Sequence, residues 1–188
     1  MPGKKTNTAD ERREKIRLEH WPDEELWTGV NEKGWFPALR TLPLIMSLLN
    51  SKAISESKAP ASVYFELLSR QITSGIIEMD HEGDHAFAAG YEGARAIRTW
   101  QVRMRLLEDI GFIRIVGMGN QPFKYVALVH PTVAVQRLYD QDRVSEDWWK
   151  AYCDKKIKTQ EATFADREQA KASAKKVIHL NQIKKTGT

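Results

Sequence analysis

The sequence contains little cysteine and no long apolar run. Cys153 is the only cysteine among 188 residues, so the chain cannot form an internal disulfide, which is typical of proteins from a reducing compartment. No apolar run approaches the roughly 20 residues that span a bilayer. The charged N-terminal stretch MPGKKTNTADERREK has no apolar segment behind it, unlike a secretory signal. We therefore expect a cytoplasmic protein that does not bind membranes.

Motifs of catalysis and of cofactor binding are also scarce. The sequence shows no glycine-rich phosphate loop and no Ser-His-Asp arrangement. The stretch HEGDH, from His81 to His85, has the H-E-x-x-H spacing of zinc proteases. That chemistry needs both histidines on one face of a helix and a third ligand, whereas Gly83 weakens a helix here and no third ligand is evident. We expect this stretch to be an acidic linker in a protein that is not an enzyme and holds no metal or cofactor.

Positive charge exceeds negative charge only mildly, but the two are unevenly distributed. The formal net charge is +4, and 41% of the residues are hydrophobic, enough to form a core. Acidic residues gather at 10–32, 78–84 and 140–147, whereas the N-terminus, the segment 94–115 and the tail after Lys155 are basic. The distribution of charge therefore says more about binding partners than the total does.

Composition and turn residues divide the chain into three regions. Residues 1–40 form a charged extension with one polar helix at 10–19 and an aromatic strap that we expect to fold back onto the core. Residues 41–130 form the central domain, and residues 131–188 form a helical extension with a basic tail. The strap contains Trp21, Trp27, Trp35 and Phe36.

The helical extension begins with two predicted amphipathic helices, 131–141 and 145–156, the second capped by Ser145. Its large aromatic residues are too many for a free surface, so they either close the core or form a dimer contact. These are Trp148, Trp149 and Tyr152.

The central domain begins with two helices and a short strand. Thr41 is placed to cap the first helix, Ser62 to cap the second, and Gly75 to end it. A polar loop is expected between the two helices. Residues 76–79 form a β-like run.

A helix-turn-helix and a hairpin follow. A short helix at Ala86–Ala89 stops at Gly90, the turn GYEG supplies glycines for positive φ, and a long helix runs from 94 to 111. The runs 112–116 and 123–129 alternate like strands, and the loop GMGNQP joins them. This element order is typical of a winged helix.

The stretch AFAAGYEGARAIRTWQVRMRLLEDIGFI resembles the core of bacterial winged helix-turn-helix DNA-binding domains. The shared features are a small alanine in the second helix, a glycine in the turn, and a third helix with an apolar-glycine-apolar end before the wing. The resemblance covers roughly residues 62–130, and the segment from Gly90 to Gly111 is about one helical turn longer than in the commonest pattern. It implies a mainly α fold with a small β-hairpin: a winged helix-turn-helix core with helical extensions at both ends. The residues of the third-helix end are Leu107, Ile110, Gly111, Phe112 and Ile113.

Helical periodicity supports the resemblance independently. One stripe of the long helix is apolar and faces the predicted core, while the opposite stripe carries three arginines. Arg103 lies at the edge of the apolar face, where its head can reach a phosphate or Glu108. The apolar stripe is Ile97, Trp100, Met104 and Leu107, and the opposite stripe is Arg95, Arg98, Val102 and Arg105.

These features predict sequence-specific binding of double-stranded DNA, because the planar fork of arginine matches guanine edges and phosphate oxygens. We expect transcriptional regulation by a homodimer in a bacterial or mobile-element setting. Two alternatives remain open: a DNA-binding protein of plasmid or phage replication or partition, and a protein-interaction module on a winged-helix scaffold. The predicted DNA contacts are Arg95, Arg98, Thr99, Gln101, Arg103 and Arg105 on the helix, and Asn120, Gln121 and Lys124 on the wing.

Overall fold

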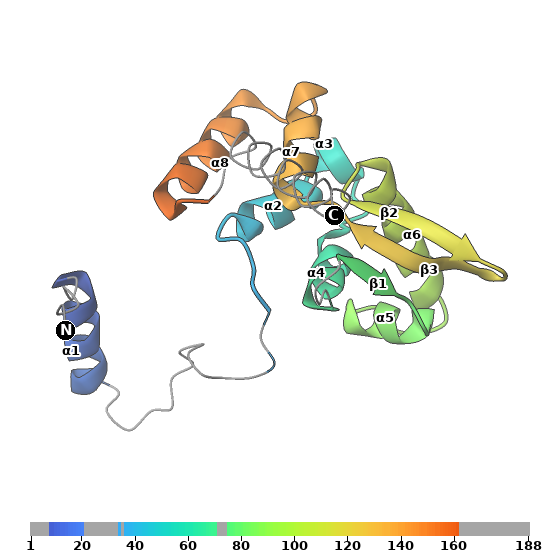
Figure 1. Cartoon of the computed structure of the whole chain (residues 1–188), viewed down its shortest axis with the longest axis horizontal. Coiled ribbons are helices and arrows are strands. Elements are labelled where there is room, and N and C mark those ends of the chain that lie inside the picture. The colour runs from blue at the N-terminus through green and yellow to red at the C-terminus, as the bar shows by residue number, and fades with distance from the viewer. Residues whose placement is uncertain (1–7, 21–33, 35, 71–74, 162–188) are drawn as a thin grey trace, which may run out of the picture. The chain divides into compact units, whose positions relative to one another are not determined.

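The computed structural model describes residues 8–20, 34, 36–70 and 75–161 (Figure 1). The chain divides into two units, Met1–Trp35 and Phe36–Thr188. The first unit contains helix α1, Thr8–His20, which is polar and exposed along most of its described length, as predicted. Within the described ranges, no helix is both long and apolar enough to cross a membrane.

The second unit is mainly helical and contains a small antiparallel sheet (Figure 1). Its helices are α2 (Leu42–Leu49), α3 (Lys52–Ser55), α4 (Ala61–Arg70), α5 (Glu82–Ala88), α6 (Ala96–Asp109), α7 (Pro131–Asp140) and α8 (Glu146–Thr159). Its strands are β1 (Ile76–Glu78), β2 (Ile113–Met118) and β3 (Gln121–Leu128).

Two of the predicted helix beginnings are wrong. Helix α4 begins at Ala61, whose N–H donates a hydrogen bond to Oδ1 of Asn50 at 3.1 Å, so the cap is a distant asparagine and Ser62 lies inside the helix. Helix α5 begins at Glu82, so the acidic stretch expected to be a linker is helical. Helix α6 begins at Ala96, close to its predicted start, and Arg95 is its N-cap residue. The loop expected before α4 contains the short helix α3.

The sheet has the strand order β1-β3-β2, with both pairs antiparallel. Ile77 of β1 and Ile115 of β2 both pair with Val126 of β3, so these three side chains share one face. The turn between β2 and β3 is only two residues long, and its Gly119 has a φ of +56° that favours glycine. A tight turn of this kind holds the two strands as a hairpin, which projects beyond the helices in Figure 1.

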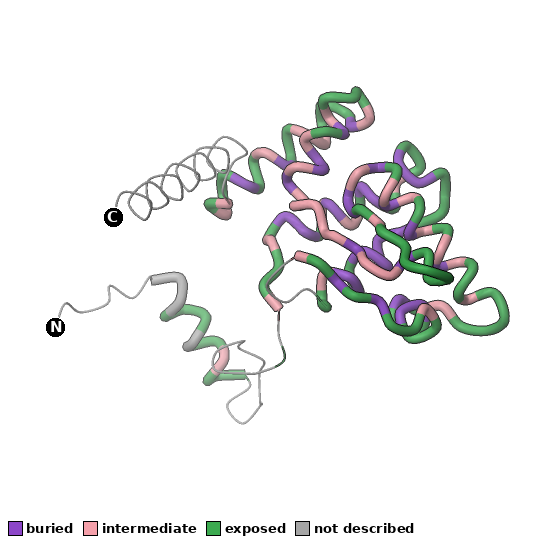
Figure 2. Tube along the Cα trace, turned by 45° about the vertical axis from the view of Figure 1, so that its right-hand side comes forward, coloured by how far each residue is buried: buried purple, intermediate pink, exposed green. Residues whose placement is uncertain are grey.

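The core fills the space where α4, α5 and α6 meet the sheet, and exposed residues lie on the outer faces and turns (Figure 2). Aromatic rings pack edge to face there: Tyr64 of α4 lies 5.1 Å from Phe112, and Trp100 of α6 lies 5.2 Å from Phe123 of β3, measured between ring centroids. Trp100 is fully buried, which anchors α6 against the sheet.

The aromatic residues of α7 and α8 form an internal stack. Tyr139 and Trp149 are stacked at 4.2 Å between centroids, and Trp148 stacks on Tyr152 at 5.2 Å. Tyr152 is fully buried within the core cluster. The structure therefore favours core closure over the dimer contact for Tyr152. Ser145 caps α8 by accepting a hydrogen bond from the N–H of Trp148, as predicted.

The start of helix α2 is hydrogen-bonded to Glu161, the last residue that the structure describes. The N–H and the hydroxyl of Thr41 each donate a hydrogen bond of 2.8 Å to the carboxylate of Glu161. The predicted cap by the Thr41 side chain is thus absent, because its hydroxyl is directed to Glu161 instead. Of the predicted aromatic strap, Phe36 packs edge to face on Phe65 of α4 at 5.6 Å, while Trp21, Trp27 and Trp35 lie outside the described residues, as does the basic tail from 162.

Candidate nucleic-acid interface

Helix α6 has one buried face and one exposed face. Trp100, Met104 and Leu107 are fully buried, as the apolar stripe predicts. Ile97 is 45% exposed, so its placement in the core stripe is wrong. The physical reason is that α6 begins only at Ala96, which leaves Ile97 in the first turn beyond the core. The tip of Ile97 lies beside α5 there, 3.9 Å from where a Cβ on Gly83 would be.

The exposed face of α6 presents cations that the described residues leave unpaired. Arg95 and Arg98 are both exposed, and neither makes an ion pair with a carboxylate in the described part of the chain. Val102 lies on the same face and is 40% exposed. Two guanidinium groups on this face are therefore available to an external anion.

Arg105 and Gln101 of α6 are engaged by other side chains of the protein. Arg105 donates a hydrogen bond of 2.9 Å to Glu108, and its guanidinium lies 4.7 Å from the ring centroid of Phe123. Gln101 donates to Glu82 of α5 at 2.6 Å. These contacts hold both side chains within the protein surface, so each must give up a partner before it binds a base.

The Arg103 side chain contacts other parts of the protein than the Glu108 carboxylate that we expected. Its guanidinium donates to the backbone carbonyl of Thr99 at 3.1 Å and lies 5.2 Å from the ring centroid of Tyr91. Glu108, one of the two expected partners, is bound by Arg105 instead. Thr99 is half-buried beneath this contact. Arg103 therefore fixes the start of α6 to the preceding turn.

The predicted DNA contacts on the β2–β3 hairpin are of two kinds. Asn120 and Gln121 are exposed at the turn between β2 and β3. Lys124, in contrast, lies 2.9 Å from a carboxylate oxygen of Glu78 and 3.8 Å from one of Asp80. The hydrogen bond to Glu78 raises the pKa of the Lys124 ammonium, which therefore stays charged. Its charge is offset by these two carboxylates, which weakens the case for a contact with phosphate.

A hollow of about 510 Å³ lies between α6 and the start of β3. Its cationic side chains are Arg98, Arg105 and Lys58, and Asp109 contributes the one carboxylate in its lining. Lys58 belongs to the loop between α3 and α4 and was not predicted as a contact. The rest of the lining is Gln101, Val102, Leu106, Pro122 and Phe123.

The loop that carries Lys58 has an unusual backbone. Glu56, Ser57 and Ala59 have φ values of +47°, +74° and +40°, a conformation that non-glycine residues rarely adopt. The Lys58 ammonium lies 3.7 Å from Glu56, a carboxylate that is itself 83% exposed. Nothing in the residue types signals this conformation, because glycine and asparagine, its usual occupants, are absent from the loop.

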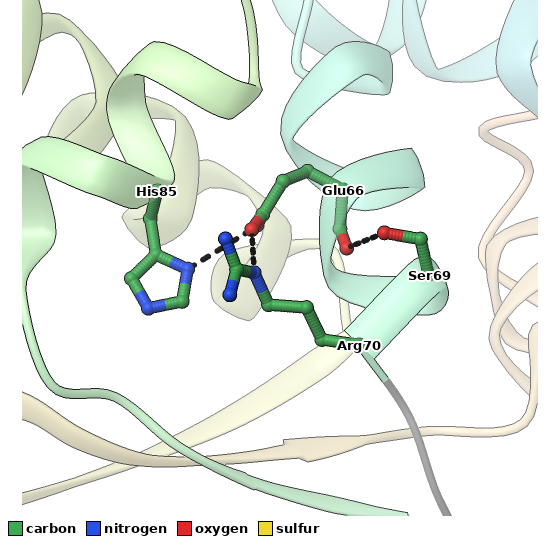
Figure 3. Close-up of polar contacts among 4 residues, drawn as sticks. All are labelled: Glu66, Ser69, Arg70 and His85. Atoms are coloured by element: carbon green, nitrogen blue, oxygen red, sulfur yellow. Dashed lines mark hydrogen bonds and ion pairs between the residues drawn. The ribbon is translucent and has the colours of Figure 1, made fainter. Parts of the chain in front are cut away.

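A buried polar cluster connects α4 to α5, directly beneath α6. Figure 3 shows Nδ1 of His85 and Nε of Arg70 both directed at one carboxylate oxygen of Glu66. The His85–Glu66 distance is 3.0 Å, and both side chains are buried. The face of the His85 ring stacks on Trp100, with the ring centroids 6.0 Å apart. The cluster thereby links α4, α5 and α6 through buried side chains.

The positions of His81 and His85 bear on the zinc-protease spacing of the stretch HEGDH. His81 is the N-cap residue that precedes α5, with an extended backbone, and the His85 side chain is buried and bound to Glu66. Across the described ranges, no group of three or more His, Cys, Asp or Glu side chains is arranged to hold a metal ion.

Comparisons with protein-family models, with curated proteins and with solved structures gave no match to this chain.

Proposed function

We propose that residues 41–130 form a winged helix-turn-helix domain that binds double-stranded DNA in a sequence-specific manner, as a non-enzymatic regulator of transcription. Helix α6 is the recognition helix in this proposal, and the β2–β3 hairpin is the wing.

The arrangement of elements supports the fold assignment. The order α4, β1, α5, α6, β2, β3, with the first strand pairing on β3, is the order of a winged helix. The turn from α5 to α6 contains Gly90 and Gly93, with φ values of +87° and +80°, so a short turn can join the two helices.

One observation carries the functional proposal: the unpaired arginines lie on the face of α6 opposite its buried anchor. Arg95 and Arg98 are exposed, while Trp100 and Met104 on the other side are fully buried. A helix held in this way can enter the major groove without losing its own packing. The guanidinium fork then matches O6 and N7 of guanine, or two phosphate oxygens.

The test is selection of bound fragments from a random duplex pool, followed by fluorescence anisotropy on the enriched sequence. We expect an enriched motif, and a slope of log K against log salt of about −3 or steeper if three or more phosphates are neutralised. A palindromic motif would support the predicted homodimer.

The test variant is Arg95→Ala/Arg98→Ala, and its control is Arg137→Ala/Lys150→Ala, which removes two exposed cations from α7 and α8. Both variants remove two positive charges, but only the first removes them from α6 and its N-cap. Failure of the wild-type protein to enrich any sequence, or equal loss in both variants, would contradict the proposal.

A further inference from the structure

The unexplained feature of the α6 surface is an exposed aliphatic side chain among charges. Val102 is 40% exposed and lies one helical turn from Arg98 and from Arg105. Asp109 continues the same face toward the end of the helix. Scattered exposed valines are ordinary on protein surfaces, so the surroundings of Val102 must decide whether it has a role.

Those surroundings form a partly apolar hollow. Val102 and Leu106 come from α6, and Pro122 and Phe123 come from the start of β3. Phe123 is almost fully buried, packs edge to face against Trp100, and has the Arg105 guanidinium over its ring. An incoming group at this place therefore meets a fixed apolar surface bordered by cations.

We infer that Val102 is a specificity-determining residue that selects thymine through its 5-methyl group, beside a guanine read by Arg98. This inference rests on the proposed function and names the base step that the same surface reads. In the major groove, the thymine methyl is the apolar feature that distinguishes this base, and small apolar side chains contact it.

The spacing along the helix fits neighbouring positions on DNA. Residues 98 and 102 are four apart, which corresponds to about 6 Å along an α-helix. Base pairs are about 3.4 Å apart along each strand. The thymine contacted by Val102 is therefore expected within two base pairs of the guanine contacted by Arg98.

The experiment uses the full chain and the duplex enriched from the random pool. Each thymine of the bound site is replaced in turn by deoxyuridine, which removes only the 5-methyl group. For the wild-type protein we expect one thymine per half-site, within two base pairs of a guanine, whose replacement weakens binding about fourfold, the loss of one buried methyl group. For Val102→Ala we expect the same replacement to weaken binding clearly less than fourfold, because the shorter side chain covers less of the methyl group.

The control is Val116→Ala, which removes a valine that is 60% exposed on β2 and lies outside the hollow. This variant should discriminate thymine from deoxyuridine as the wild-type protein does. The inference is overturned if no thymine matters to the wild-type protein, or if Val102→Ala discriminates as strongly as the wild-type protein. Either result leaves tight, sequence-specific binding intact, so it is distinguishable from failure of the proposed function, in which no sequence is enriched at all.

Discussion

Helix α6 and the β2–β3 hairpin both carry predicted polar contacts, yet the fold places these side chains differently. Arg95 and Arg98 on α6 meet no carboxylate among the described residues, whereas Lys124 on β3 lies against Glu78 and Asp80. The difference follows from how each element is placed. A strand acquires neighbours on both sides through pairing, and β1 brings acidic residues next to Lys124. The outer face of α6 near its start receives no such strand neighbour, and its carboxylate contact lies further along, where Glu108 pairs with Arg105. DNA binding should therefore depend on α6 far more than on Lys124.

The largest effect is expected from removing the buried contact between α4 and α5 that packs against α6. Glu66→Ala leaves the buried ring nitrogen of His85 without its partner and should lower the free energy of unfolding by about 2–3 kcal/mol. Urea unfolding followed by tryptophan fluorescence measures this change. Ser69→Ala is the matched control, because its hydroxyl is exposed and donates only to the backbone carbonyl of Glu66. Its cost should stay below about 1 kcal/mol, and equal costs would mean that the buried cluster does not support the helix.

The next largest effect tests the helix side of the comparison directly. Arg98→Ala should weaken specific DNA binding by about 1–3 kcal/mol if the guanidinium contacts a guanine. Arg105→Ala should cost less, because Arg105 must first release Glu108. Anisotropy titrations of both variants on one duplex give the order. A larger loss for Arg105→Ala would show that the ion pair does not restrain it.

A smaller effect is expected from the strained loop. Lys58→Ala should reduce the salt dependence of binding by about one unit of slope, the change expected for one lost phosphate contact, with little change in sequence preference. Titrations at several salt concentrations measure the slope. Lys52→Ala provides the matched control, since Lys52 is exposed on α3 and lies outside the hollow lining. An unchanged slope for Lys58→Ala would remove this loop from the interface.

The smallest effect is expected on the hairpin. Glu78→Gln removes one of the two carboxylates beside Lys124, so binding should tighten slightly, because an exposed ion pair offsets little charge. Lys124→Ala, in contrast, should change affinity less than Arg98→Ala does. If Lys124→Ala proves as damaging as Arg98→Ala, the hairpin is an equal partner in binding and the contrast between the two regions fails.

Local patterns predicted much of the fold, and long-range pairings explain what they missed. The apolar spacing of Trp100, Met104 and Leu107 and the glycines around α6 are local signals, and the structure agrees with them. The partners of Lys124 and Gln101 come from β1 and α5, so no spacing within α6 or the hairpin could indicate them. The sequence did not indicate Lys58 as a contact for a similar reason. Its position beside α6 depends on a left-handed backbone at residue types that rarely adopt it.

The contact between Thr41 and Glu161 has a consequence for how the chain matures during its synthesis. The two residues are 120 positions apart, so a ribosome adding about 5–20 residues per second makes the carboxylate about 6–24 s after the threonine. Until then the start of α2 has no such acceptor, although all the residues of the helix already exist. The nascent protein therefore completes the start of α2 with a residue that follows α8, and only then are residues 41 and 161 held together.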